Sequence, residues 1–200
     1  VAMLSNFGRE GANGEVKVGG TWIPEYARGA DLYSQDVTPL NHMHWKARNP
    51  GQNDLLITLY DVWVLKGKKY DEIPIASWTP VDHQPAPPGV LEWCKKPNVT
   101  PLAMSRYGQD VMAKAGVESF YVPHAIEQVF KPTNKIDGVS SRKFIGLEET
   151  DFVVGMNAAN KASGLVHRKA FAENLLAFAM FAKDKPDAKL YLHTDMYGSY

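Results

Sequence analysis

Residues 151–194 constrain the fold most, because they read as a strand, a polar loop, a helix and a second strand. Residues 152–154 form a short apolar run bounded by polar residues, as a buried parallel strand does. Residues 168–183 carry an apolar stripe at helical spacing, and Pro186 ends the helix because proline lacks the N–H that continues it. Residues 189–194 supply the second strand. This order predicts a parallel βαβ unit with a right-handed crossover.

The loop of this unit carries polar and basic side chains just before the helix, namely Asn157, Asn160, Lys161, His167, Arg168 and Lys169. Free N–H groups, the positive end of the helix dipole and nearby cations together suit an anionic ligand such as a diphosphate. A solvated loop with ordinary surface lysines is the alternative. The spacing matches neither a Walker A loop nor GxGxxG.

Composition sets the class of protein. The chain has 200 residues, of which 44% are hydrophobic and 22% charged, so it is long enough and apolar enough for a globular α/β core. Its formal net charge of zero argues against a nucleic-acid partner. The single cysteine, Cys94, excludes an internal disulfide, and no secretory signal or membrane-length apolar run is present. The spacing of His42, His44 and His193 does not fit a metal site. We therefore expect a cytoplasmic protein without a metal.

Further elements are expected before this unit. Apolar runs predict strands at residues 1–7, 73–78, 100–104 and 119–122, and a buried strand at 54–60. Short helices are expected at 90–95, where Cys94 would be buried, and at 106–115, between Ser105 as N-cap and Gly116 as the left-handed residue that ends the helix. The glycine-rich segment 8–20 is expected to be a loop. Residues 27–43 carry no clear pattern.

Polar and aromatic residues follow several of these strands. Asp61 and Trp63 follow strand 54–60, Asp82 and His83 lie in the proline-rich loop after the next strand, and His124 follows strand 119–122. Residues beyond the carboxyl ends of parallel strands line the ligand crevice of open α/β sheets. A turn-capping Asp61, a core Trp63 and a structural Asp82–His83 pair are the alternatives.

Five motifs follow one another along the chain, namely strand-D-x-W (55–63), strand-x-P-x-D-H-x-P (75–85), M-S-R-Y-G before a helix (104–108), Y-V-P-H-A-I (121–126) and F-x-P (130–132). Their order resembles that of the glycosyltransferases of family 4. The resemblance covers nearly the whole chain. It implies a GT-B fold, in which residues 1–126 are part of an N-terminal, acceptor-side Rossmann-like domain, 127–149 a linker, and 150–200 the start of the C-terminal nucleotide-sugar-binding domain.

The resemblance also implies a function. Family members move a sugar from a nucleotide-sugar to an acceptor with retention of configuration and without an essential metal or other cofactor. Lys169 takes the position of the lysine that meets the donor diphosphate, with Arg168 and Lys161 as helpers. His124 and Asp82 would hold donor or acceptor sugar as catalytic residues, and Asp61, Trp63 and His83 would line the acceptor cleft. The implied partners are a nucleotide-sugar and a glycan, lipid or small-molecule acceptor. The expected location is the cytoplasm, with peripheral association with the inner face of the membrane as an option.

The sequence departs from the family pattern at Ala125, Gln128 and Met156, where the family usually has glycine, an acid and arginine. The late glutamates of the family would lie beyond Tyr200, and its first glycine loop before Val1, so we expect a fragment that is inactive alone. Two alternatives stay open. One is a non-catalytic binding or assembly module that forms homo-oligomers through exposed sheet edges. The other is a different GT-B enzyme, such as a nucleotide-sugar epimerase.

Overall fold

The computed structural model describes residues 1–6, 9–160, 162–163 and 166–195. The chain divides into two compact units, an N-terminal unit (Val1–Ile126) and a C-terminal unit (Glu127–Tyr200). Both combine helices with parallel strand pairs, so the expectation of a mixed α/β protein with a parallel sheet is confirmed. No helix in the described part of the chain has the length and apolar character needed to cross a bilayer.

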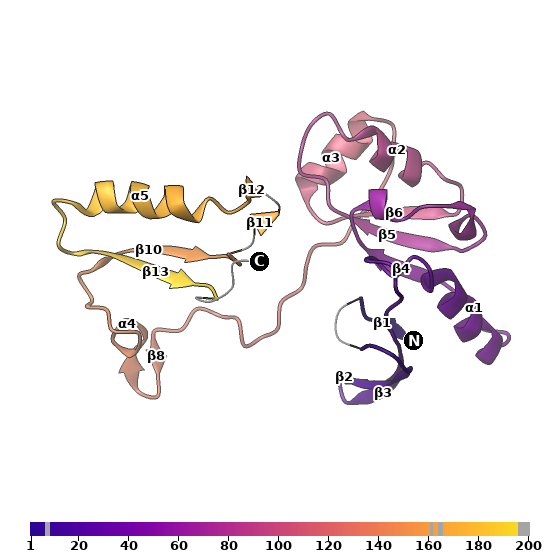
Figure 1. The fold of residues 1–200 in the computed structure, drawn as a ribbon, viewed down its shortest axis with the longest axis horizontal. Helices are drawn as coiled ribbons and strands as arrows, with labels where there is room; N and C mark the ends of the chain where they lie inside the picture. The colour runs from indigo at the N-terminus through magenta and orange to yellow at the C-terminus, as the bar shows by residue number, and fades with distance from the viewer. Residues whose placement is uncertain (7–8, 161, 164–165, 196–200) are drawn as a thin grey trace. The chain divides into compact units, whose positions relative to one another are not determined.

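A parallel four-stranded sheet organises the N-terminal unit (Figure 1). Its strands follow the order β4 (Leu56–Leu59), β5 (Ile75–Thr79), β6 (Val99–Ala103) and β7 (Phe120–Tyr121). The crossover helices are α2 (Pro88–Cys94) and α3 (Arg106–Lys114), and two 3₁₀ turns, η1 (Val62–Val64) and η2 (Lys68–Tyr70), join β4 to β5. Parallel neighbours need such crossovers, since a tight hairpin cannot join them.

Local signals determine where α3 begins and ends. The Ser105 hydroxyl accepts a hydrogen bond from the Gly108 N–H at 2.9 Å, as an N-cap does. Gly116 has a φ of +75°, the left-handed conformation that ends a helix at low steric cost. Both features confirm the prediction from the sequence.

Within the N-terminal unit, the described residues cover only one face of the sheet fully. Side chains from β5 and β6 pack with Trp93 of α2 and with Val111 and Met112 of α3 in the core, which also buries Cys94 as predicted. On the opposite face, Ile57 and Phe120 are 64% and 67% exposed. Strand 54–60 was expected to be buried, and this prediction is wrong for Leu55, Ile57 and Leu59, which are each more than half exposed. An apolar run does not reveal whether one face or both are covered.

The beginning of the N-terminal unit forms a separate small sheet. Its strands β1 (Met3–Leu4), β3 (Thr21–Tyr26) and β2 (Gly14–Val18) lie in that order. Segment 8–20 was expected to be a loop, but β2 pairs antiparallel with β3. Gly19 and Gly20, with φ of +54° and +86°, form the two-residue turn between them. Helix α1 (Thr38–Arg48) follows, largely within the segment without a clear pattern.

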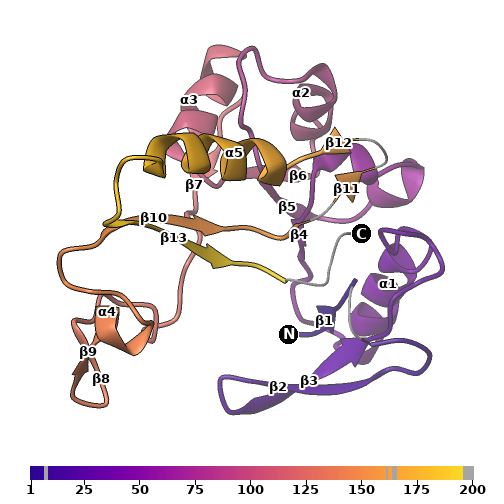
Figure 2. The same ribbon diagram turned by 60° about the vertical axis from the view of Figure 1, so that its left-hand side comes forward.

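The C-terminal unit contains the predicted βαβ arrangement. Strand β10 (Phe152–Asn157) runs parallel to β13 (Ala188–His193), and α5 (Phe171–Ala182) lies along one side of the pair (Figure 2). Two short antiparallel strands, β11 (Ala162–Ser163) and β12 (Val166–His167), lie in the loop before α5. The helix begins three residues later than predicted, because Ala170 is left-handed with a φ of +48°.

Other parts of this unit also differ from expectation. Residues 127–149, expected to be a linker, contain the hairpin β8 (Lys135–Ile136) and β9 (Val139–Ser140) and the short helix α4 (Ser141–Phe144). Phe152, expected to be buried, is exposed but contacts the Phe181 ring, with centroids 5.6 Å apart. Among the described residues, every fully buried hydrophobic side chain lies between Tyr26 and Val117, so the C-terminal unit adds none.

Candidate functional site

A pocket of about 220 Å³ lies beyond the carboxyl ends of β4 and β5. Four of the predicted cleft residues line it, Asp61 and Trp63 after β4 and Asp82 and His83 after β5. Parallel neighbours end at the same edge of a sheet, which is why residues about twenty positions apart meet there. Prolines of the loop and Val90 of α2 complete the wall.

Asp82 and His83 form a hydrogen-bonded pair in this pocket. The His83 Nδ1 and Asp82 Oδ1 atoms are 2.7 Å apart, and the side chains are 64% and 89% exposed. The hydrogen bond from His83 holds the pKa of the Asp82 carboxyl below its usual value. An ionised Asp82 accepts the Nδ1 hydrogen, so Nε2 of neutral His83 is left as a proton acceptor. A carboxylate that orients an imidazole in this way can support proton transfer from a hydroxyl group.

Trp63 and Asp61 both line this pocket and are exposed. Trp63 is 58% exposed, which overturns the alternative that it is a core residue. Its ring meets Tyr33 edge to face, with centroids 5.6 Å apart and planes at 84°. Asp61 precedes η1, and its side chain makes no capping bond; its backbone carbonyl accepts the Val64 N–H instead. The capping alternative for the Asp61 carboxylate is therefore also wrong.

His124 lies outside the lining of this pocket. Its ring packs against Trp78 at the end of β5, with centroids 4.8 Å apart. The Trp78 indole N–H donates to the Val122 carbonyl at 2.7 Å, which ties the segment after β7 to β5. Trp78 was missed in the sequence because it lies inside a predicted strand, where a core role is the ordinary expectation.

The predicted diphosphate residues belong to the C-terminal unit. Arg168 and Lys169 occupy an exposed turn before α5, and no ion pair involves either of them in the described part of the chain. The Asn174 side-chain amide donates to the Lys169 and Ala170 carbonyls at 3.1 and 2.8 Å, which holds the turn against the first turn of α5. Lys161 lies outside the described residues.

Over the residues with described structure, no group of three or more His, Cys, Asp and Glu side chains is arranged to hold a metal ion. Cys94 is buried, and burial raises its thiol pKa to about 11, so it is a packed thiol and not a ready nucleophile or ligand.

The chain matches no family model, no curated protein and no solved structure. The geometry of the site and the ordered motifs are therefore the observations that bear on its function.

Proposed function

We propose that this chain carries the sugar-binding and donor-binding elements of a retaining glycosyltransferase with a GT-B fold. The observation that carries the proposal is the pocket beyond β4 and β5, where Asp61, Trp63, Asp82 and His83 meet. An exposed indole offers a flat apolar face to a sugar ring, and carboxylate and imidazole groups bond its hydroxyls. The order of motifs along the chain supports the same function.

Each predicted residue has a chemical role in this proposal. Transfer requires stabilisation of the diphosphate as it leaves, because its departure makes the sugar carbon oxocarbenium-like. Arg168 and Lys169 would supply positive charge at the start of α5, whose dipole adds to it. Asp82 and His83 would orient a sugar hydroxyl, with His124 next to Trp78 as a further contact. No step of this scheme needs a metal ion.

Replacement of Trp63 tests the sugar pocket. We expect Trp63→Ala to weaken binding of monosaccharides and their methyl glycosides about tenfold or more, since stacking on a large aromatic face would be lost. Saturation-transfer NMR with a panel of sugars measures this. Trp22→Ala is the matched control, because Trp22 is similarly exposed, at 62%, and does not line the pocket. Equal binding by wild type and Trp63→Ala would contradict the proposal.

Replacement of Lys169 tests the diphosphate site separately. Calorimetric titration with UDP, GDP and ADP should show at least about tenfold weaker binding to Lys169→Ala, because a charge-assisted hydrogen bond is worth about 1.5–3 kcal/mol. Lys183→Ala, at the other end of α5, should bind as wild type does. If Lys169→Ala binds the nucleotides unchanged, the site assignment is wrong. Consumption of a nucleotide-sugar without an acceptor would favour the epimerase alternative.

A binding or assembly module is the second candidate, favoured by the uncovered sheet face. Leu55, Ile57 and Leu59 are each more than half exposed beside the open edge of β4. Apolar faces and open edges of sheets favour pairing with another chain. A chain that stays monomeric at all concentrations in light scattering would count against this candidate.

A further inference from the structure

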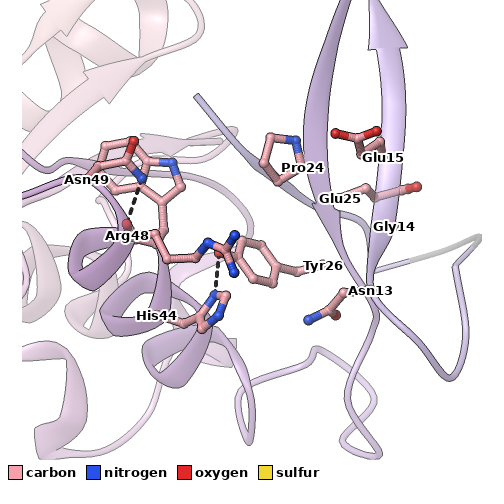
Figure 3. Close-up of a pocket in the computed structure, with 10 residues that line it drawn as sticks. Asn13, Gly14, Glu15, Pro24, Glu25, Tyr26, His44, Arg48 and Asn49 are labelled. Atoms are coloured by element: carbon pink, nitrogen blue, oxygen red, sulfur yellow. Dashed lines mark hydrogen bonds between the residues drawn. The ribbon is translucent and has the colours of Figure 1, made fainter.

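A second hollow lies in the N-terminal unit, between the β2–β3 hairpin and α1 (Figure 3). Its volume is about 290 Å³, at the small end of ligand pockets. The strand side includes Pro24, Glu25 and Tyr26, and the helix side includes His44, Trp45 and Arg48. Neither the sequence motifs nor the proposed glycosyl transfer uses these residues.

The helix wall follows from the spacing of its residues. His44 and Arg48 are four positions apart, as are Trp45 and Asn49, so the four side chains share one side of α1. The Asn49 amide donates to the Trp45 carbonyl at 2.7 Å and holds the end of the helix. In Figure 3, Arg48 extends from α1 toward the β3 side of the pocket, where Tyr26 lies.

The hydroxyl group of a buried tyrosine forms a hydrogen bond with His44. The Tyr26 oxygen lies 2.8 Å from His44 Nδ1, and Tyr26 is buried. Burial raises the Tyr26 pKa, while the Arg48 charge opposes this, so the phenol remains protonated at neutral pH. In the tautomer in which this hydroxyl donates to Nδ1, neutral His44 carries its hydrogen on Nε2, and that nitrogen is a donor.

The charged side chains of the two walls differ in whether they have an ion-pair partner. The Glu25 carboxylate is paired with Arg9, with Nε and Oε2 2.6 Å apart. Arg48 makes no ion pair within the described residues, and its guanidinium offers a planar set of donors that matches carboxylate and phosphate groups. Glu15, on β2, is an exposed carboxylate of the hairpin wall. Positive charge without a protein partner is thus concentrated on the helix wall.

We propose that this hollow binds a small organic anion, with its carboxylate or phosphate group on Arg48 and a flat apolar body against Trp45 and Tyr26. With Nδ1 accepting from the Tyr26 hydroxyl, His44 Nε2 would be a further donor for the ligand on the same helix. The site is distinct from the pocket beyond β4 and β5, since the two share no lining residue. The hollow would bind this anion as an effector or as a substrate, in addition to the sugar and the nucleotide of the proposed glycosyl transfer.

Titration of the 200-residue chain with phenyl phosphate, benzoate and phenol tests this proposal, with binding followed by NMR and calorimetry. We expect the two anions to bind and phenol to bind at least about tenfold more weakly, because it lacks the charge that Arg48 pairs with. The relative affinity of phenyl phosphate and benzoate identifies the preferred head group. Arg48→Gln should lose about tenfold or more in affinity for both anions.

Matched variants make the result specific. Lys17→Gln removes an exposed cation from the same hairpin but outside the pocket, and it should bind the anions as wild type does. Arg48→Lys keeps the charge without the planar donor set and should fall between wild type and Arg48→Gln. Absence of anion binding by wild type, or unchanged binding by Arg48→Gln, would overturn the proposal. So would an equal loss of affinity in Lys17→Gln.

Discussion

Asp54 lies just before β4, and its side chain contacts two residues of α1. Its carboxylate oxygens lie 2.9 Å from His42 Nε2 and 3.0 Å from Lys46 Nζ, and the Asp54 and His42 side chains are largely buried. The hydrogen bond from Lys46, followed by that from His42, lowers the Asp54 pKa below its ordinary value of 3.8. The carboxylate is thus more stable in the folded chain than in the unfolded chain.

This interaction predicts a dependence of stability on pH. A lowered folded pKa means that the stabilisation is complete above the unfolded pKa and is lost as pH falls through the folded pKa. Melting temperatures of wild type and Asp54→Asn should therefore differ most at pH 5 and above, and converge as pH falls below about 4. Asp110→Asn, an exposed change on α3, is the control. A wild-type advantage that stays constant from pH 5 to pH 3 would contradict this prediction.

Elements were predictable from the sequence where a local signal defined both ends. The capping Ser105 and the left-handed Gly116 define α3, and the apolar runs before polar residues define β5 and β10. The strand β2 was missed because glycines surround it, and its pairing with β3 stabilises an extended conformation that local propensity does not favour. Helix α1 was missed because it buries only Thr38 and Pro39 and so lacks an apolar stripe.

Burial was less predictable than secondary structure, because it depends on which other elements pack against a strand or helix. The apolar pattern of β4 and α5 correctly indicates their type, yet Leu59 and Met180 are mostly exposed. Asp61 and Asp82 were correctly predicted to lie together, because residues that follow neighbouring parallel strands meet at one edge of the sheet. The same rule does not extend to the pocket beside α1, whose walls come from an antiparallel hairpin and a helix.

The whole chain consists of two units with very different shares of the buried apolar side chains. The hydrophobic core cluster spans Val62 to Val117, all within the N-terminal unit. The boundary between the units follows Ile126, and residues 122–131 are exposed without helix or strand. Such a segment offers its backbone to a protease, whereas core strands do not.

Limited proteolysis tests this division. Thermolysin, which cleaves before large apolar residues, should cut first at Ile126, Val129 or Phe130, with release of an N-terminal fragment that keeps its secondary structure. Mass spectrometry of the first products and circular dichroism of the fragment measure the two parts of the prediction. Helix α5 provides the internal comparison, because its exposed Met180 lies in regular structure and should be cut later. A first cut within β5 or β6 would contradict the division.

The uneven distribution of buried apolar side chains has a calorimetric consequence. The heat capacity of unfolding rises with the apolar surface that becomes hydrated, and the described C-terminal unit has no fully buried hydrophobic side chain to contribute. Its free energy of unfolding should therefore curve less with temperature than that of the N-terminal unit, whose core exposes more apolar surface on unfolding. Most of the curvature expected for the whole chain then comes from the N-terminal unit, and cold should weaken that unit more than the C-terminal unit.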